Sequence, residues 1–383
     1  GVTNFTTAAA EISEGAFYSC EALRGVRLSG AETIGADAFS GCTSLRYFMT
    51  SDDLSSVADN AFEGVTFLDR YGVEMEPTAE NLRGHKFTGE ASVLTLYVPP
   101  LGGTFPLEPY VYKIQTNEAG NMTVGVRGFV DGCHVDVVDI PESVRYLGFD
   151  WSVTKVLNQA FMDDADITEV ILSYAVSTGR EAFSGCTGIE KVTLGPSFES
   201  LGYKSFVGCT SLTEFAVDDG NGAFEAVDGV LYSEDLSVLY RYPAGMGGVF
   251  DAPESVETID SYAFDGCSHL KKVVLGPEVK YINYRAFRNC IALADVNWTD
   301  NIISLGEDAF IGCTSLTTVT LSAKLSDMGV STFSGCTGIN SLTVHDGCTL
   351  IGGSAFNGCN KIQTVKLPQS VKRIGSSAFS GCT

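Results

Sequence analysis

Apolar residues recur along the chain at fixed intervals and predict one short strand in every repeat. The clearest copies follow the pattern L-x-x-V-x-L, as in LKKVVL at 270–275, LTTVTL at 316–321, INSLTV at 339–344 and IQTVKL at 362–367. Alternation turns one face of such a strand inward and leaves the other open, and the β-branched residues in many slots favour a strand. The A-F-x-G-C stretch before each strand is too short for a full helix, so it predicts a turn or a single helical turn on the opposite side.

Phenylalanine and cysteine mark the period of this pattern. Six phenylalanines are each separated by 23 residues: Phe264, Phe287, Phe310, Phe333, Phe356 and Phe379. Six cysteines keep the same step: Cys267, Cys290, Cys313, Cys336, Cys359 and Cys382. Earlier copies carry Phe17, Phe39, Phe62, Phe161, Phe183 and Phe206. One strand per 20–29 residues is the leucine-rich-repeat pattern. The predicted fold is therefore a leucine-rich-repeat solenoid of the α/β type, mostly β with short helical turns, whose parallel sheet along one face is interrupted by short antiparallel β segments.

The repeated phenylalanines and cysteines are predicted to form the core of the solenoid. A single coil cannot bury its apolar edge, so coils must stack on one another. We expect each of these side chains to point inward and touch its counterparts in the coils above and below, at about 1.5–3 kcal/mol per buried apolar side chain. This structural ladder comprises Phe264, Phe287, Phe310, Phe333, Phe356, Cys267, Cys290, Cys313, Cys336 and Cys359.

The string I-G-x-x-A-F-x-G-C-x-x-L resembles the BspA-type (Treponema-type) subclass of leucine-rich repeats. It appears as IGADAFSGCTSL (34–45), IDSYAFDGCSHL (259–270) and IGGSAFNGCNKI (351–362). Residues 218–259 resemble the family's "DGVLY…YP" interruption, and residues 109–160 resemble the hairpin that often opens such an array. The resemblance implies a surface-exposed or secreted protein of anaerobic gut or oral microbes, or of parasitic protists, that acts as an adhesin or ligand-binding protein.

Breaks in the period divide the chain into predicted parts. Residues 1–98 are expected to be the end of a first array with a closing strand segment, and 99–108 a linker marked by VPPLGG. Residues 109–150 would form a β-hairpin cap with NEAG at its turn, and 151–383 the main array with a β interruption at about 218–252. A single continuous solenoid with one long bulged insertion is the competing interpretation. Both ends fall within a coil, so we expect the chain to be a piece of a longer protein.

Charge narrows the range of partners. The chain has 24 Lys plus Arg against 47 Asp plus Glu, a net charge of −23. Such a surface repels phosphate backbones and anionic lipid, which argues against nucleic acid and bare membrane as partners. No run of 18 apolar residues exists to span a bilayer, so no direct membrane insertion is expected. The first twenty residues lack the basic and apolar regions of an intact signal peptide.

Chemistry-bearing residues do not combine into a catalytic or metal motif. Ten of the twelve cysteines lie at the phased position, with only Cys133 and Cys348 out of register, and no close C-x-x-C pair exists. Cys133 and His134 are neighbours in a presumed strand and should therefore face opposite ways. An acidic stretch departs from EF-hand spacing and predicts solvated turns: Asp218, Asp219, Asn221, Asp228 and Asp235. We therefore predict no enzyme activity, no cofactor and no metal.

The open face of the predicted sheet is the candidate binding surface. Its first row comprises Glu169, Lys191, Glu214, Lys272, Asp295, Thr318, Ser341 and Thr364. The row is mixed in charge and lacks the aromatic platforms typical of carbohydrate grooves, while Trp298 falls on an inward position. Sequons occur at Asn4, Asn121 and Asn297, the last within a predicted strand.

These features predict a non-catalytic protein, extracellular or at the cell surface, that binds a protein or glycan partner through its solenoid surface. The partner would belong to a host or to a neighbouring cell's surface or matrix. The alternative is a structural spacer, or a subunit that associates with itself in a surface layer or sheath.

Overall fold

Strands recur along the chain at the spacing of the sequence period. The computed structural model describes residues 2–383, in which the one helix is the short α1 (Ala79–Leu82), capped by Thr78. Contacts group the chain into two units: Gly1–Thr104, Lys113–Val124 and Ser143–Val153 form the first, and Phe105–Tyr112, Gly125–Glu142 and Thr154–Thr383 form the second. The boundaries 1–98, 99–108, 109–150 and 151–383 stay predictions.

The first unit begins with three stacked coils. Its long strands β1 (Asn4–Thr7), β3 (Gly25–Leu28) and β5 (Tyr47–Met49) pair in parallel. The two-residue strands β2 (Glu11–Ile12), β4 (Thr33–Ile34) and β6 (Ser56–Val57) form a second parallel ladder. Four further strands complete the larger sheet: β7 (Thr66–Leu68), β8 (Glu74–Met75), β9 (Lys86–Glu90) and β10 (Val93–Leu96). Because β9 runs antiparallel to β5, the parallel array ends there.

A hairpin follows the first array. The strands β12 (Tyr110–Glu118) and β13 (Asn121–Phe129) are joined by two residues, at the turn expected from NEAG. They belong to a sheet in the order β11 (Thr104–Leu107), β12, β13, β16 (Phe149–Val156) and β15 (Ser143–Tyr146). The segment expected to be a linker therefore contributes a strand, β11.

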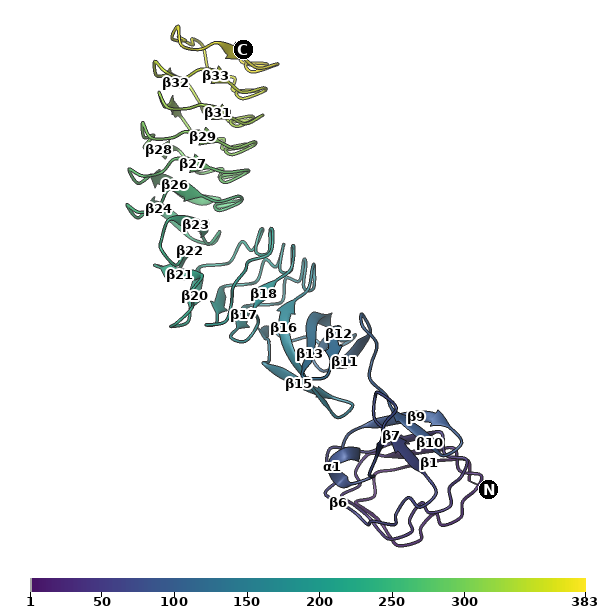
Figure 1. The fold of residues 1–383 in the computed structure, drawn as a ribbon. Coiled ribbons are helices and arrows are strands. Elements are labelled where there is room, and N and C mark those ends of the chain that lie inside the picture. The colour runs from purple at the N-terminus through teal and green to yellow at the C-terminus, as the bar shows by residue number, and fades with distance from the viewer. Residues whose placement is uncertain (1) are drawn as a thin grey trace. The chain divides into compact units, whose positions relative to one another are not determined.

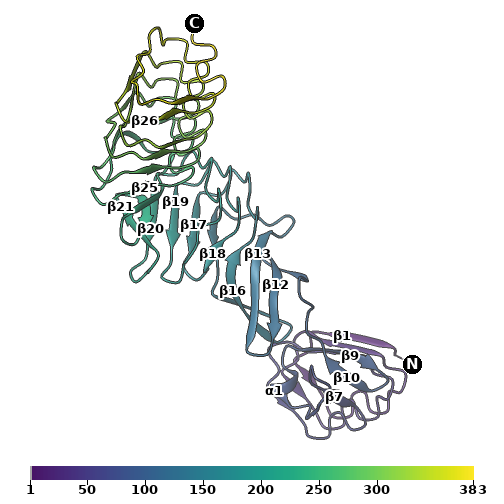
Figure 2. The same cartoon turned by 45° about the horizontal axis from the view of Figure 1, so that its top comes forward.

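The second unit contains the longer array. Its first long strands, β14 (Val137–Asp139), β17 (Glu169–Leu172), β19 (Lys191–Leu194) and β20 (Glu214–Val217), pair in parallel, and β17, β19 and β20 are seen together in Figure 2. The short strand β18 (Ser177–Thr178) pairs with the end of β16.

An antiparallel segment then interrupts the array, as the sequence predicted. The strands β21 (Phe224–Val227), β22 (Val230–Ser233) and β23 (Val238–Arg241) pair in antiparallel fashion. The last of them, β23, pairs in parallel with the short strand β25 (Thr258–Ile259) of the next coil. The interruption therefore joins the ladder of short strands instead of leaving it.

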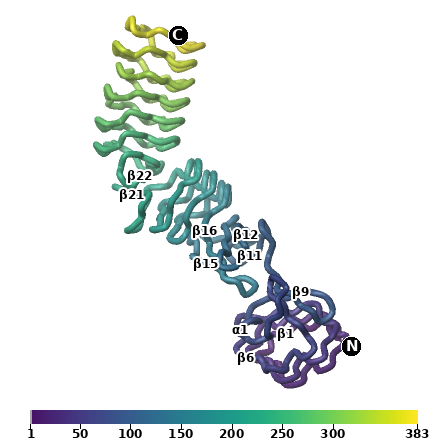
Figure 3. Tube along the Cα trace, in the orientation of Figure 1, coloured from purple at the N-terminus to yellow at the C-terminus, as the bar shows by residue number. Residues whose placement is uncertain are grey.

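Regular coils resume after the interruption and continue to the last described residues (Figures 1 and 3). The long strands are β24 (Gly247–Asp251), β26 (His269–Val274), β28 (Asp295–Val296), β30 (Thr318–Leu321) and β32 (Ser341–Val344). The short strands are β27 (Tyr281–Ile282), β29 (Ser304–Leu305), β31 (Asp327–Met328), β33 (Leu350–Ile351) and β34 (Arg373–Ile374). Most coils thus contribute to two ladders, of which only the longer was predicted from the sequence.

Two expected strand features are wrong. Residues 362–367, IQTVKL, carry the strand pattern but form no strand, because they make no ladder with β32. Asn297 was placed inside a strand, whereas β28 ends at Val296. Beyond Val296 the side-chain amide of Asn297 replaces the backbone hydrogen bonds of the ladder. Its Oδ1 accepts the N–H of Leu275, and its Nδ2 donates to the carbonyl of Leu275.

The A-F-x-G-C segments form turns and not helical turns. The residue before nearly every A-F pair adopts a left-handed conformation, for example Glu181 at φ 55°, Arg285 at 54° and Asp308 at 56°, and this is incompatible with a right-handed helix. The turns instead hydrogen-bond from coil to coil: the N–H of Phe287 donates to the carbonyl of Ala309 at 2.7 Å, and that of Phe310 to Thr332 at 2.7 Å.

The phenylalanines form continuous ring stacks inside the coils. Centroids of successive rings from Phe264 to Phe379 lie 4.5–5.4 Å apart, with interplanar angles of 6–14°. In the interruption Tyr242 takes the phenylalanine position and stacks on Phe264 at 5.0 Å. Trp298 is half-buried and packs against Phe310 and Phe333.

The phased cysteines add a hydrogen bond to this core. The thiol of Cys290 donates to the carbonyl of Phe264 at 3.0 Å, and Cys313 and Cys336 repeat the contact with Phe287 and Phe310. Each thiol therefore ties its coil to the phenylalanine of the preceding coil.

Replacing Phe310 by alanine should remove a ring that contacts Phe287 and Phe333 on either side. We expect a loss of about 3–5 kcal/mol in the free energy of unfolding, because a cavity opens at two coil interfaces. Urea unfolding followed by circular dichroism measures this loss. Thr318→Ala, at an exposed strand position, should change stability by less than about 0.5 kcal/mol. A Phe310→Ala loss below about 1 kcal/mol would contradict the stacking role of the ring.

Candidate functional site

The predicted row on the long strands begins with three charged residues in register. Glu169, Lys191 and Glu214 are direct partners on β17, β19 and β20. The Lys191 Nζ lies 3.2 Å from Glu214 Oε1, and both side chains are nearly half exposed. Exposed pairs of this kind contribute about 0–1 kcal/mol to stability. The structure therefore brings these three residues together on an accessible face. Their interactions contribute little to the stability of the fold.

Beyond the interruption the row continues with one charged pair and is uncharged after it. Lys272 and Asp295 are partners on β26 and β28, with Nζ and Oδ2 2.8 Å apart, and the hydrogen bond from Asp295 raises the pKa of Lys272. Thr318 and Ser341 are partners on β30 and β32, and both are exposed. Thr364 lies outside any strand, within the segment that forms no ladder.

A second row of polar side chains lies on the turn side, at the left-handed position of each coil. Gln159 Nε2 donates to Glu181 Oε2 at 3.0 Å, and this hydrogen bond lowers the pKa of Glu181. Lys204 Nζ lies 3.6 Å from Glu181 Oε1 and 5.3 Å from the centroid of the Tyr262 ring. This row was not predicted from the sequence, because the A-F segment was interpreted only as part of the packed core.

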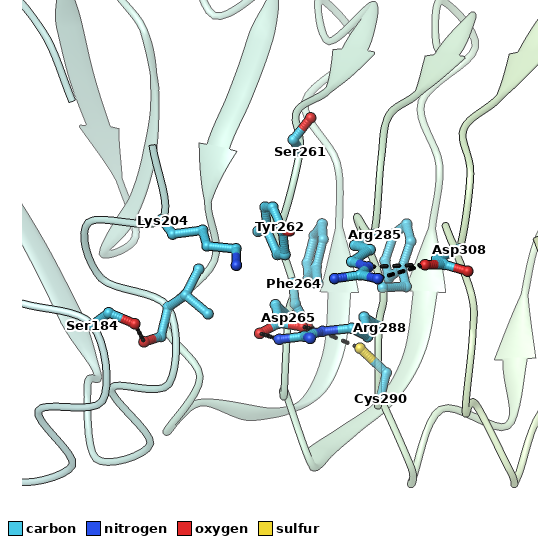
Figure 4. Close-up of polar contacts among 12 residues, drawn as sticks. Ser184, Lys204, Ser261, Tyr262, Phe264, Asp265, Arg285, Arg288, Cys290 and Asp308 are labelled. Atoms are coloured by element: carbon cyan, nitrogen blue, oxygen red, sulfur yellow. Dashed lines mark hydrogen bonds and ion pairs between the residues drawn. The ribbon is translucent and has the colours of Figure 1, made fainter. Parts of the chain in front are cut away.

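The turn row continues past the interruption (Figure 4). Arg285 and Asp308 form an ion pair with Nη2 and Oδ2 2.8 Å apart. Three residues further along the coil, Arg288 Nη2 donates to Asp265 Oδ2 at 3.0 Å, and its guanidinium lies 5.5 Å from the centroid of the Tyr262 ring. The available signal was the residue before A-F, which is polar or charged in nearly every copy.

One group of described residues has ligand atoms close enough for a metal ion. His134, Asp164 and Asp166 each place one such atom within 4.8 Å of the others. His134 Nε2 lies 3.1 Å from Asp164 Oδ1, and this hydrogen bond raises the pKa of His134. Exposed acidic groups often gather without a metal, so we assign none here. The expectation that Cys133 and His134 lie in a strand is wrong, because β13 ends at Phe129 and a turn follows.

The polar and acidic residues of the interruption serve its turns, and the expectation that these turns are solvated is wrong for Asn221. Asn221 is buried: its Nδ2 donates to the carbonyls of Gly195 and Phe198, and its Oδ1 accepts the N–H groups of Ala223 and Phe224. Asp235 accepts hydrogen bonds from both hydroxyls of Ser233 and Ser237, and these bonds lower the pKa of Asp235 to about 2. Both residues have local partners that account for them.

Burial makes the thiols poor nucleophiles. Desolvation raises the pKa of Cys42 to about 11 and that of Cys186 and Cys359 to about 12. The thiolate is the reactive form, so a raised pKa suppresses reaction at neutral pH. Cys348, one of the two out of register, is also buried, whereas Cys133 is half-buried. None of the helical structure in residues 2–383 is long or apolar enough to cross a bilayer.

Thiol labelling should divide the cysteines into two classes. Nine are buried and three are half-buried, the latter being Cys20, Cys133 and Cys382. Iodoacetamide at pH 8 should add at most these three groups to the native protein, and all twelve after unfolding in urea. Intact-mass spectrometry counts the adducts. Rapid native labelling of Cys290 or Cys313 would contradict the buried thiol column.

Comparison with known proteins identifies the repeat. A family model described as the BspA type leucine rich repeat region matches residues 3–100, 123–226 and 249–360. A leucine-rich repeat protein from Eubacterium ventriosum is 18% identical at a TM-score of 0.48, with 73% of this chain and 94% of that chain covered. The pneumococcal vaccine antigen PcpA is 19% identical at 0.43, covering 73% and 95%. A leucine rich cell surface protein from Faecalibacterium prausnitzii is 20% identical at 0.36, covering 73% and 98%.

No curated protein matches the chain. The assignment rests on the family model, whose three matched segments span most of the sequence and coincide with the stacked coils of both units. The chain belongs to the BspA-type leucine-rich-repeat family.

Proposed function

We propose that this protein is a non-catalytic binding module at the cell surface or outside the cell, and that it recognises a protein partner through the open face of its long strands. The observation that carries the proposal is the row Glu169, Lys191 and Glu214, which the strand register aligns on an accessible face. The family and a neighbour described as a cell surface protein support the location.

The chemistry of this face suits a protein better than a glycan or a nucleic acid. Its first row contains carboxylates, amines and hydroxyls but no aromatic ring, so it offers no platform for stacking on sugars. The net charge of −23 disfavours phosphate backbones. A folded protein partner with an alternating charge pattern can place its carboxylates against Lys191 and Lys272. Its basic groups can then pair with Glu169 and Glu214.

The proposal involves no catalytic step. A nucleophilic cysteine needs a lowered pKa or an adjacent base, whereas burial raises the pKa of Cys42, Cys186 and Cys359. Several charged residues on the two faces of the coils are paired with residues in neighbouring coils, as in Lys272–Asp295 and Arg285–Asp308. Such pairs define a pattern of charge on the surface that a partner can recognise.

Charge reversal on the strand face tests the proposal. Surface plasmon resonance over immobilised fibronectin, fibrinogen, laminin and collagen should detect binding to at least one of them. Lys191→Glu combined with Lys272→Glu should weaken that binding by about tenfold or more, because two opposite-charge contacts become repulsive. Lys361→Glu changes the same charge at an exposed turn residue away from the row and should leave binding within about twofold.

Raising the salt concentration should weaken binding of the unaltered protein, since exposed charges are screened within about 8 Å at physiological ionic strength. Equal binding by the double variant and the unaltered protein would overturn the strand face as the site. Size-exclusion chromatography with light scattering examines self-association: polymers that form with increasing concentration, together with no retention on any matrix protein, would favour the structural alternative.

A further inference from the structure

A pocket of about 410 Å³ lies where the interruption meets the turn side of the array. Three sequence segments line it. The coil before the interruption contributes Glu199 and Tyr203, the interruption contributes Phe224, Tyr240 and Arg241, and the following coil contributes Asp260. All of them belong to the second unit. Its volume is within the range of pockets that hold small ligands.

The backbone register explains why an arginine is buried here. The N–H of Tyr242 donates to the carbonyl of Ala263 at 2.8 Å, as the N–H of Phe264 does to Ala286 at 2.7 Å. Tyr242 thus occupies the phenylalanine position, and Arg241 occupies the position of the small alanine that precedes it in regular coils. A long cationic side chain has replaced a methyl group in the interior of the array.

The Arg241 side chain is held but not neutralised. It is 7% exposed, and its Nη1 donates to the carbonyls of Tyr240 and Ser261, each at 2.7 Å. Its Nε has no hydrogen-bond partner, and burial lowers the pKa of Arg241 although the carboxylates of Asp260 and Asp265 favour the charged form. A buried donor without an acceptor destabilises the folded state, so this N–H group is available to an acceptor atom of a ligand.

The other lining groups have a different character. The rings of Phe224 and Tyr240 lie 5.3 Å apart and form an aromatic wall. Tyr203 is 48% exposed, and its hydroxyl lies 3.0 Å from that of Tyr262, which fixes the ring at the pocket mouth. The carboxylates of Glu199 and Asp260 supply acceptors. The pocket therefore combines aromatic surface, carboxylate acceptors and a guanidinium.

We propose that this pocket binds one saccharide residue of a glycan. Sugars present hydroxyls that both donate and accept hydrogen bonds, together with apolar C–H faces that pack on aromatic rings. A hydroxyl can donate to Glu199 or Asp260 while another oxygen accepts from the guanidinium of Arg241, and Tyr203 or Tyr240 supports the C–H face.

A simple ion satisfies fewer of these groups. An anion suits Arg241 but meets the carboxylates of Glu199 and Asp260, and a cation suits the carboxylates but meets Arg241. Neither uses the aromatic rings fully. An uncharged polyhydroxylated ring finds a complementary partner in all three kinds of group.

Saturation-transfer NMR with the full chain tests the proposal, using the uncharged sugars galactose, glucose, mannose and N-acetylglucosamine, with sulfate and spermidine as ionic probes. At least one sugar should bind with a Kd on the order of 1 mM, as expected for a single saccharide unit in a small site. Tyr240→Ala should weaken binding about tenfold through loss of the ring, and Glu199→Gln should weaken it several-fold through loss of the charged acceptor.

Matched controls separate the pocket from general effects. Tyr281→Ala and Glu278→Gln make the same chemical changes outside the pocket, at an exposed strand residue and an exposed loop residue, and should leave the Kd unchanged. No sugar signal at any concentration up to about 50 mM would overturn the proposal, as would a signal that Tyr240→Ala and Glu199→Gln both leave intact. Binding of sulfate alone or of spermidine alone would also overturn it, in favour of an ion site.

The pocket lies on the turn side and the proposed protein-binding row on the strand side. Lys191→Glu with Lys272→Glu should therefore leave sugar binding unchanged, and Tyr240→Ala should leave matrix-protein binding unchanged. Failure of one proposal can in this way be told apart from failure of the other.

Discussion

Equivalent residues of successive coils must lie directly above one another, so that the same contacts form between each coil and the next. Nearly every other feature of this structure depends on that constraint. Phenyl rings stack at 4.5–5.4 Å, thiols donate to the carbonyl of the preceding coil, and turn N–H groups donate to the following coil. These contacts involve different atoms but share one period. The ring stack tolerates a difference of one residue in coil length, since Phe17–Phe39 and Phe39–Phe62 both stack although the steps are 22 and 23 residues.

The turn side shows how this constraint also creates a surface. A left-handed conformation at a residue other than glycine costs about 1–2 kcal/mol, yet Glu181, Lys204, Tyr262 and Arg285 all adopt it. The cost recurs in coil after coil and is offset by hydrogen bonds between coils, because the same turn presents its N–H to the neighbouring carbonyl. Most side chains at this position lie outside the apolar core, with Tyr262 and Asp308 as buried exceptions, so packing constrains their identity only weakly. Acidic, basic, aromatic and hydroxyl residues can therefore alternate there without disturbing the fold.

The stacked core and the open strand face were predictable from the sequence, because a stack of equivalent side chains requires the same residue type at the same position in successive coils. The spacing of phenylalanine and cysteine indicated the stacks, and strand alternation indicated which residues share the open face. Features that arise from single residues were not predictable. Tyr242 takes the place of a phenylalanine outside the A-F motif, Asn297 ends a strand with its own amide, and IQTVKL has the pattern of a strand without its pairing. The donor role of the thiols was also missed, since composition and spacing describe cysteine as a small apolar residue.

The interruption is where a repeat protein of this kind can form a concave site. Contiguous coils leave no room between them, as the close Cβ approaches at glycines such as Gly202 and Gly329 illustrate. Residues 218–252 separate two such coils while β23 preserves the ladder, and pockets of about 270 and 410 Å³ border this segment. An arginine at the position of an alanine would be intolerable between contiguous coils, because there is no volume for it. Its presence at Arg241 follows from the separation that the interruption creates, and the same separation gives the extended charged strand face a small concave neighbour with quite different chemistry.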